Sequence, residues 1–265
     1  MFEVGIARQG SARFNAELGI VSSLFMLLGV ALFVSSFNPP LFYALNARLV
    51  PWLGEPFWAV ITNLGDGFFL FPLAMMLFWR SPQQQLATLL SMLALAAAVN
   101  VLKVVVGLPR PFAELGVDWV SMVGPLPNSK SFPSGHSGTA FLLVGLSLMY
   151  FKSRLLKGGI AFMATMVCLS RIAVGVHWPS DILFGIGLGI SCALLGGYWS
   201  QRVQPGFKAR LIFILLGSLS VGVLPGYNNG FQHYSAVLMM QYTLAVVAVV
   251  AVLSELLWLY RDYRD

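Results

Sequence analysis

Charged residues are scarce in this chain. They make up 10% of its 265 residues, whereas about 25% is usual in a soluble domain. Hydrophobic residues reach 58%, and the mean hydropathy is +0.79. This balance excludes an ordinary soluble domain and predicts an all-α, polytopic membrane helical bundle. The net charge of +6 is accounted for mostly by membrane topology, so no nucleic-acid partner is predicted.

Cysteine is also rare, and no segment has the composition of a linker. Cys168 and Cys192 both lie inside apolar runs, so they are expected to be core residues rather than disulfide partners or metal ligands. The chain contains no internal repeat and no low-complexity tract. Residues 1–265 are therefore predicted to form one membrane-embedded domain.

Long apolar runs are what the chain has in abundance. A transmembrane helix needs about 20 apolar residues, and about eight segments meet or approach that length. These segments are residues 18–37, 57–79, 86–108, 137–151, 158–176, 182–199, 211–224 and 236–260. The first segment lacks a clear small-residue cleavage site, which favours a membrane span over a signal peptide.

Basic residues fall mostly on one side of these spans. If the N-terminus lies inside, eleven of the 16 Lys and Arg residues occupy inner segments. Positive charge concentrates on cytoplasmic loops, so both termini are predicted to be cytoplasmic, with the protein in a cell inner membrane. The inner residues are Arg8, Arg13, Arg80, Lys152, Arg154, Lys157, Arg202, Lys208, Arg210, Arg261 and Arg264. The outer residues are Arg48, Lys103, Arg110, Lys130 and Arg171.

Two apolar features bear on packing. The outer segment 38–56 has large apolar residues at helix-like spacing, so it is expected either to lie flat on the membrane as a helix or to form a collapsed loop. Gly185 and Gly189 are four residues apart in the sixth predicted span. We expect this pair to allow a close contact between two helices.

Three polar blocks stand at the outer ends of predicted spans. They are KVVVGLPRPF at residues 103–112, PSGH at residues 133–136 and SRIAVGVHWPSD at residues 170–181. Charged residues are costly in a membrane helix, so their positions indicate function by default. The three blocks are therefore the candidate site.

The first two blocks suit the binding of a phosphate. Lys103 and Arg110 supply positive charge, and a guanidinium binds two oxygens of one phosphate. The PSGH block is typical of a helix start, where the backbone N–H groups of residues 134–136 are free to bind an anion. Gly135 lets the anion approach the backbone, and the Ser134 hydroxyl adds a donor.

The third block supplies a nucleophile. Arg171 is a further cation, and His177 lies four residues before Asp181 near the start of the sixth span. If the helix begins at about His177, the two side chains share a face. Asp181 then accepts a hydrogen bond from one ring nitrogen and leaves the other as a lone-pair nucleophile.

Together these residues predict a site for a phosphate ester or a pyrophosphate. Lys103, Arg110 and Arg171 are enough to neutralise the phosphate. The blocks also lack the cluster of carboxylates that Mg²⁺ prefers. We therefore expect no metal and no other cofactor.

The arrangement resembles the signature of the type 2 phosphatidic acid phosphatase superfamily, which includes membrane lipid phosphatases and is related to vanadium haloperoxidases. The matching pattern is Lys103-x6-Arg110-Pro111, then Pro133-Ser134-Gly135-His136, then Ser170-Arg171-x5-His177-x3-Asp181. The resemblance implies a helical bundle with a six-span core. The catalytic core then lies within residues 57–200, with motifs at residues 103–111, 133–136 and 170–181, and the last two spans are an addition.

The resemblance also implies a role for each polar residue. His177 is expected to be the nucleophile that forms a phosphohistidine, and Asp181 orients it. His136 is expected to be the general acid that protonates the leaving group. The implied phosphate clamp comprises Lys103, Arg110, Ser134, Gly135 and Arg171.

Three polar residues outside the blocks have open interpretations. Asp66 either pairs with Lys103 and supports it from behind, or only satisfies a helix break at residues 65–67. Asn100 lies on the same helix stripe as Lys103 and shares the supporting interpretation. His233 is either a plain outer-loop residue or a contact to a lipid headgroup.

The favoured function is an inner-membrane lipid phosphatase whose site faces the periplasm. Its substrates are expected to be lipids of the undecaprenyl diphosphate, phosphatidylglycerol phosphate or phosphatidic acid type. The three blocks do not distinguish among these lipids, because they contact only the phosphate. One alternative is a phosphotransferase that moves phosphate from a lipid diphosphate to lipid A. Another is a non-catalytic transporter of anionic lipid or phosphate, which leaves the His177–Asp181 spacing unexplained. The bilayer and its lipids are the only partners predicted, and the sequence does not determine the oligomeric state.

Overall fold

The computed structural model describes residues 12–79 and 81–264, and these residues form helices and loops without a strand. The elements are α1 (Ala12–Phe33), α2 (Asn38–Leu53), α3 (Glu55–Leu64), α4 (Gly67–Leu77), α5 (Pro82–Val106), α6 (Pro111–Leu115), η1 (Val117–Trp119), α7 (Gly135–Tyr150), α8 (Arg154–Ala173), α9 (Pro179–Ser200), α10 (Phe207–Val223), η2 (Leu224–Gly226) and α11 (Ser235–Arg264). The predicted all-α class is confirmed. Arg8 and Arg80, two of the predicted inner cations, lie outside the described residues.

Most of these helices are long and apolar enough to cross a membrane. Within the described residues, six meet that description singly, and α3 with α4 makes a seventh that is bent by 56°. The chain is therefore a multi-pass membrane protein. α7 has 16 residues, fewer than the about 20 that a straight span requires. The number of spans, about eight by apolar length, remains a prediction.

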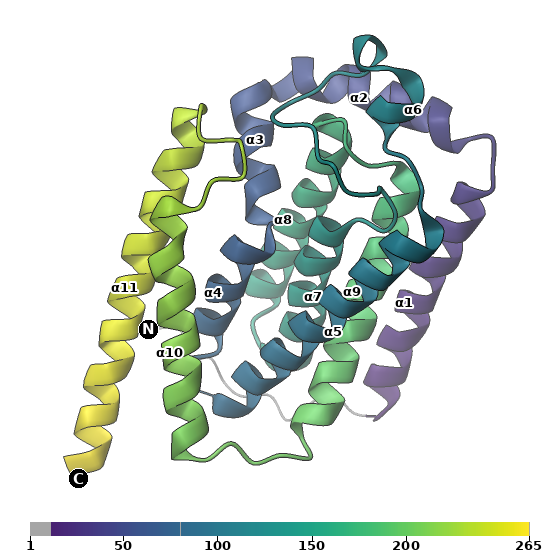
Figure 1. Cartoon of the computed structure of the whole chain (residues 1–265). Helices are drawn as coiled ribbons and strands as arrows, with labels where there is room; N and C mark the ends of the chain where they lie inside the picture. Colours follow the sequence, from purple (N-terminus) through teal and green to yellow (C-terminus); the bar gives the residue numbers. More distant parts are fainter. Residues whose placement is uncertain (1–11, 80, 265) are drawn as a thin grey trace.

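α9 lies at the centre of the bundle, between α7 and α1 in Figure 1, and it also packs against α5. Its glycines bring it unusually close to α7. A Cβ atom added to Gly189 would stand 2.1 Å from the carbonyl oxygen of Gly138, and one added to Gly185 would stand 2.6 Å from that of Ser134. The predicted close helix contact is confirmed, and it places the first turns of α7 and α9 side by side.

α2 lies across the upper end of the bundle in Figure 1. The segment predicted as a surface helix or a collapsed loop is thus a helix. Asn46 ties it to the end of α8, because its Nδ2 donates to the carbonyl oxygen of Ile172 at 2.9 Å. Asn38 ties it to the start of α9, because its Nδ2 donates to Ser180 Oγ at 2.9 Å. α2 therefore fixes both helix ends that flank His177.

The two ends of the bundle differ in content. α2 and α6 lie at the upper end of Figure 1, whereas the first residues of α1 and the C-terminal end of α11 lie at the lower end. This arrangement agrees with a topology in which the start of α1 and the end of α11 lie opposite the polar blocks. The side of the membrane that each end faces remains a prediction.

α10 and α11 form a hairpin at one flank of the bundle, beside α4 (Figure 1). The loop between them, residues 227–234, returns to the core. Tyr227 Oη donates to Asp66 Oδ2 at 3.0 Å, and Tyr234 Oη donates to Glu55 Oε2 at 2.7 Å. The hairpin is thereby anchored to the break between α3 and α4 and to the start of α3.

Candidate active site

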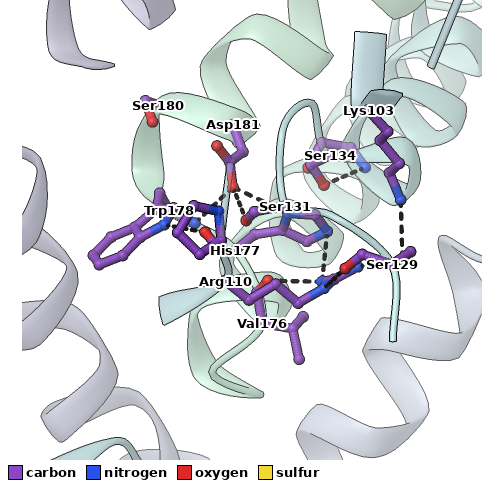
Figure 2. Close-up of polar contacts among 12 residues, drawn as sticks. Lys103, Arg110, Ser129, Ser131, Ser134, Val176, His177, Trp178, Ser180 and Asp181 are labelled. Carbon is purple, nitrogen blue, oxygen red and sulfur yellow. Dashed lines mark hydrogen bonds and ion pairs between the residues drawn. The ribbon is translucent and has the colours of Figure 1, made fainter. Parts of the chain in front are cut away.

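The three polar blocks meet in one cluster, which Figure 2 shows from the side chains of Lys103 and Arg110 to those of His177 and Asp181. Segments as distant as the end of α5 and the start of α9 contribute to it. The start of α7 joins them through its N-cap, because the Ser134 N–H donates to the Asp181 carbonyl oxygen at 3.1 Å. The structure thus brings together what the sequence only placed at three span ends.

The first block directs Arg110 into the cluster. Gly107 ends α5 in the left-handed region, at φ 63°, a backbone conformation that glycine adopts at little cost. The chain then turns, and Arg110 becomes the N-cap residue of α6. Its Nη1 donates to the Val176 carbonyl oxygen at 2.7 Å. The guanidinium is therefore held beside the residue that precedes His177.

Ser129 is a second anchor of this block. Arg110 donates to it twice, from Nε to the carbonyl oxygen at 2.7 Å and from Nη2 to Oγ at 2.8 Å. Lys103 Nζ donates to the same Oγ at 3.4 Å. Ser129 therefore holds the two cations near each other, in a fork geometry that phosphate oxygens also satisfy.

The third block forms the histidine–aspartate pair. His177 Nδ1 lies 3.2 Å from Asp181 Oδ2, and the two residues are 2% and 0% exposed. A carboxylate only accepts, so Nδ1 carries the proton in this pair and Nε2 keeps its lone pair. His177 Nε2 lies 3.4 Å from Arg110 Nη1. Nε2 therefore faces the cation that would bind a phosphate.

The pair forms for a different local reason than predicted. α9 begins at Pro179 rather than at about His177, and Trp178 is its N-cap. Asp181, the third residue of the helix, folds back to accept a hydrogen bond from the Trp178 N–H at 2.9 Å. The contact with His177 is thus a by-product of a capping arrangement, not of two side chains on one helix face.

The electrostatic setting favours a neutral imidazole at His177. Burial, and then the charge of Arg110 and the other nearby cations, lower the pKa of His177 well below its usual value. A neutral ring at pH 7 retains the Nε2 lone pair. This is the protonation state that nucleophilic attack requires.

The second block provides the start of α7. Ser134 is the N-cap, and its Oγ accepts a hydrogen bond from the Ser137 N–H at 3.3 Å and lies 2.9 Å from Ser137 Oγ. The prediction of a free N–H group at Ser134 is wrong, because that group donates to Asp181. The N–H groups of Gly135 and His136 make no backbone hydrogen bond of this kind within the described chain. They are the donors that the helix start offers to an anion.

His136 and Arg171 complete the cluster. The His136 ring makes no hydrogen bond to any other described side chain or backbone group, and burial, followed by the charges of Arg171, Lys103 and Arg110, lowers its pKa well below the usual value. Arg171, 6% exposed, donates from Nη1 to Thr62 Oγ1, while its buried Nε has no acceptor in the described part of the chain. Buried donors are normally paired, so an anionic ligand fits this donor set.

The three polar residues outside the blocks, Asp66, Asn100 and His233, each make different contacts. Asp66 caps α4, since its Oδ1 accepts from the Phe68 N–H at 2.9 Å, and it forms no ion pair with Lys103 among the described residues. Of the two interpretations of Asp66, the structure therefore agrees with the one in which it caps the helix break at residues 65–67. Asn100 Nδ2 donates within α5, to the Ala96 carbonyl oxygen at 2.8 Å. His233 is exposed in its loop, with Nδ1 3.1 Å from the Gly230 carbonyl oxygen.

Two serines in the loop before α7 were not predicted. Ser129 holds the cations, and the Ser131 Oγ donates to Asp181 Oδ2 at 2.5 Å. The Ser131 N–H also donates to the Leu108 carbonyl oxygen at 2.9 Å, which ties the first block to the second. The only sequence feature that could have indicated Ser129 and Ser131 as part of the site is their position just before the PSGH block. A serine-rich turn gives the same signal without any site.

Comparison with known proteins places the same segment in a family. Residues 85–205 match the sequence model of the PAP2 superfamily. Phosphatidylglycerophosphatase B of Bacillus subtilis (strain 168) is 31% identical over an alignment of 174 residues, and the alignment covers 58% of this chain and 78% of that protein. Lipid A 1-phosphatase of Rhizobium etli is 29% identical over an alignment of 202 residues, and the alignment covers 68% of this chain and 84% of that protein.

A solved structure extends the similarity to the fold. The crystal structure of LpxE from Aquifex aeolicus matches with a TM-score of 0.55 at 29% identity, and the match covers 64% of this chain and 98% of that one. All three polar blocks lie within residues 85–205. α10 and α11 lie beyond that segment.

Proposed function

Because this chain belongs to the PAP2 superfamily, we propose that it is an integral membrane lipid phosphatase, a hydrolase of a lipid phosphate ester or diphosphate. The observation that carries the proposal is the buried His177–Asp181 pair, in which His177 Nε2 lies 3.4 Å from Arg110 Nη1. A carboxylate at one ring nitrogen orients the histidine and leaves the lone pair of the other nitrogen for attack, which is the arrangement that covalent phosphoryl transfer through a histidine requires.

The substrate is proposed to be a membrane lipid that carries a terminal phosphate. The chain is similar to a phosphatidylglycerophosphatase and to a lipid A 1-phosphatase, which supports lipids of these kinds beside undecaprenyl diphosphate and phosphatidic acid. The cluster offers donors and cations only to the phosphate. The identity of the rest of the lipid must therefore depend on residues outside the three blocks.

The first proposed step forms a phosphohistidine. The Nε2 lone pair of His177 attacks phosphorus, and the bond between phosphorus and the lipid-side oxygen breaks. The bound anionic phosphate offsets the cations that lower the pKa of His136, so in the complex His136 carries a proton and gives it to that oxygen. General acid catalysis of this kind contributes about 10²–10⁴-fold. Arg110 and the other cations stabilise the charge on the phosphoryl oxygens. The lipid leaves as an alcohol or, from a diphosphate, as a monophosphate.

The second proposed step regenerates the enzyme. His136, now neutral, accepts a proton from a water molecule as that water attacks phosphorus. The phosphorus–nitrogen bond breaks, its electron pair returns to His177 Nε2, and inorganic phosphate leaves. His136 is again protonated, so no external acid, base or cofactor is consumed.

Phosphate release by the purified chain tests this proposal. The panel comprises undecaprenyl diphosphate, phosphatidylglycerol phosphate, phosphatidic acid and lipid A, each in detergent micelles. We expect inorganic phosphate from at least one of them. Appearance of a phosphorylated second lipid in place of free phosphate would identify a phosphotransferase, and no turnover of any lipid would reject the proposal.

Removal of divalent metal is predicted to leave activity unchanged. The phosphate is neutralised by three cationic side chains and two backbone N–H groups, so no Mg²⁺ is required for charge balance. Incubation with excess EDTA should change the rate of phosphate release by less than about twofold. Loss of activity that added Mg²⁺ restores would contradict metal independence.

The proposed orientation, with the site on the outer face, is tested by cysteine labelling. Lys130→Cys lies in the exposed loop before α7, whereas the native Cys168 and Cys192 are buried. A membrane-impermeant maleimide should label Lys130→Cys in intact spheroplasts. Gln204→Cys, exposed in the loop between α9 and α10, is the control and should react only after the membrane is opened. The reverse pattern would invert the topology.

A further inference from the structure

A large cavity adjoins the cluster on the flank where α10 packs. Its volume is about 790 Å³, within the range of roughly 300–1,000 Å³ that is usual for small-molecule sites. It lies between α4, α5 and α10. Its lining residues are Asp66, Gly67, Phe68, Phe71, Asn100, Lys103, Leu219, Ser220, Val223 and Tyr227.

Lys103 belongs both to this cavity and to the candidate active site. Its side chain lines the cavity, while its Nζ donates to Ser129 Oγ beside Arg110. The charge that would bind a phosphate is thus reached from the cavity. A molecule that fills the cavity and contacts Lys103 is therefore positioned with one end at the phosphate clamp.

The remainder of the wall is amphipathic. Phe68, Leu219 and Val223 present apolar side chains that are 54%, 59% and 49% exposed, and they belong to the part of the lining contributed by α4 and α10. The Asp66 carboxylate also lines the cavity and accepts hydrogen bonds from the Phe68 N–H and the Tyr227 hydroxyl. Burial and then the Asp66 carboxylate raise the pKa of Tyr227, so its hydroxyl remains a donor. The wall is therefore charged at Lys103 and Asp66 and apolar along α10.

The C-terminal hairpin supplies the wall that the matched family segment lacks. Leu219, Ser220, Val223 and Tyr227 all lie beyond residue 205, where the family match ends. The hairpin is also held in place by the contacts of its outer loop with Asp66 and Asn63. These hydrogen bonds therefore hold the wall in place relative to Lys103.

We propose that the cavity between α4, α5 and α10 holds the apolar chain of the lipid phosphate substrate, and that the C-terminal hairpin thereby determines which lipid chains are accepted. The phosphate lies at Lys103 and the chain runs along Phe68, Leu219 and Val223 toward the bilayer. The inference rests on the proposed function, since it assigns the lipid part of that substrate.

A bulky residue at Ser220 tests the assignment. Ser220→Trp fills the cavity, and Ser218→Trp is the matched control, because both serines are half-buried on α10 and donate only within that helix. Activity is measured on the panel lipid that wild type hydrolyses fastest and on an analogue with the same headgroup and six-carbon chains. We expect Ser220→Trp to lose at least about tenfold in kcat/KM for the long-chain lipid and less than about twofold for the analogue, with Ser218→Trp near wild type on both.

A second pair of variants keeps the test decisive if Ser220→Trp does not fold. Leu219→Trp lies in the wall, whereas Leu215→Trp is one turn earlier and outside it, and the two native side chains are 59% and 57% exposed. An unchanged ratio of long-chain to short-chain activity in the wall variants would overturn the inference while leaving the proposed function intact. Absence of phosphate release by the wild type would instead reject the proposed function.

Discussion

Replacement of His177 by alanine is expected to reduce kcat for phosphate release by about 10⁴-fold or more, since removal of a hydrolase nucleophile costs up to about 10⁶-fold. The ring is buried between Asp181 and Arg110, with its Nε2 directed at the cation. No other described imidazole is paired with a carboxylate in this way. The cations would still bind the lipid phosphate, so we expect KM to change much less than kcat.

The measurement is single-turnover and steady-state phosphate release in detergent, together with alkali-quenched trapping of radioactive phosphate on the protein. Wild type should show a base-stable, acid-labile phosphoryl group, and His177→Ala should show none. His177→Gln is a second variant that preserves more of the buried volume, and size-exclusion profiles report whether each variant is folded. His233→Ala, in an exposed loop, is the matched histidine control. Phosphate release by His177→Ala at more than a tenth of the wild-type rate would exclude His177 as the nucleophile.

The second large effect is expected at Asp181. Three groups donate to its Oδ2, namely His177 Nδ1, the Trp178 N–H and the Ser131 hydroxyl, whereas its buried Oδ1 has no donor among the described residues. In Asp181→Asn the amide oxygen is expected to occupy the Oδ2 position, since an NH₂ group there would face the Trp178 N–H. The imidazole tautomer is then preserved, and the negative charge is what the substitution removes.

Loss of that charge should reduce kcat by about 10²–10⁴-fold. Phosphorylation of Nε2 makes the His177 ring positively charged, and a carboxylate 3.2 Å from Nδ1 stabilises that charge in a buried site where water does not screen it. An aspartate that orients a histidine in a hydrolase triad contributes about 10⁴-fold. That value includes the loss of the correct tautomer, which Asp181→Asn retains, so the loss expected here reflects the missing charge alone and does not exceed it.

Ser131→Ala is the matched control for Asp181→Asn. It removes one of the donors to the same carboxylate oxygen but keeps the charge, so a loss of no more than about tenfold in kcat is expected. Rates are compared on one lipid from the panel, with folding checked by thermal unfolding in detergent. Equal losses in the two variants would show that hydrogen-bond geometry, rather than charge, is what Asp181 contributes.

The sequence by itself determined the fold class and the three polar blocks that meet in the cluster. Apolar length and scarce charge are enough to predict membrane helices, because the bilayer requires backbone groups to be satisfied within each helix. The polar blocks stood out because charge in such helices is costly. Local spacing also placed His177 near Asp181. The predicted reason, a shared helix face, was only partly right. The helix begins two residues later than predicted, at Pro179, and the pair forms because Asp181 caps the helix.

The tertiary structure decided how these residues are held and what surrounds them. Ser129 joins Lys103 to Arg110, and the hydroxyl of Tyr227 meets Asp66 across 161 positions of the chain. Contacts of this kind depend on how helices pack, and packing is set by the shapes of many side chains rather than by any local pattern. For the same reason the cavity beside Lys103 has no sequence signature. The chemistry could thus be predicted from spacing, whereas the wall that the lipid chain would contact became visible only in the folded chain.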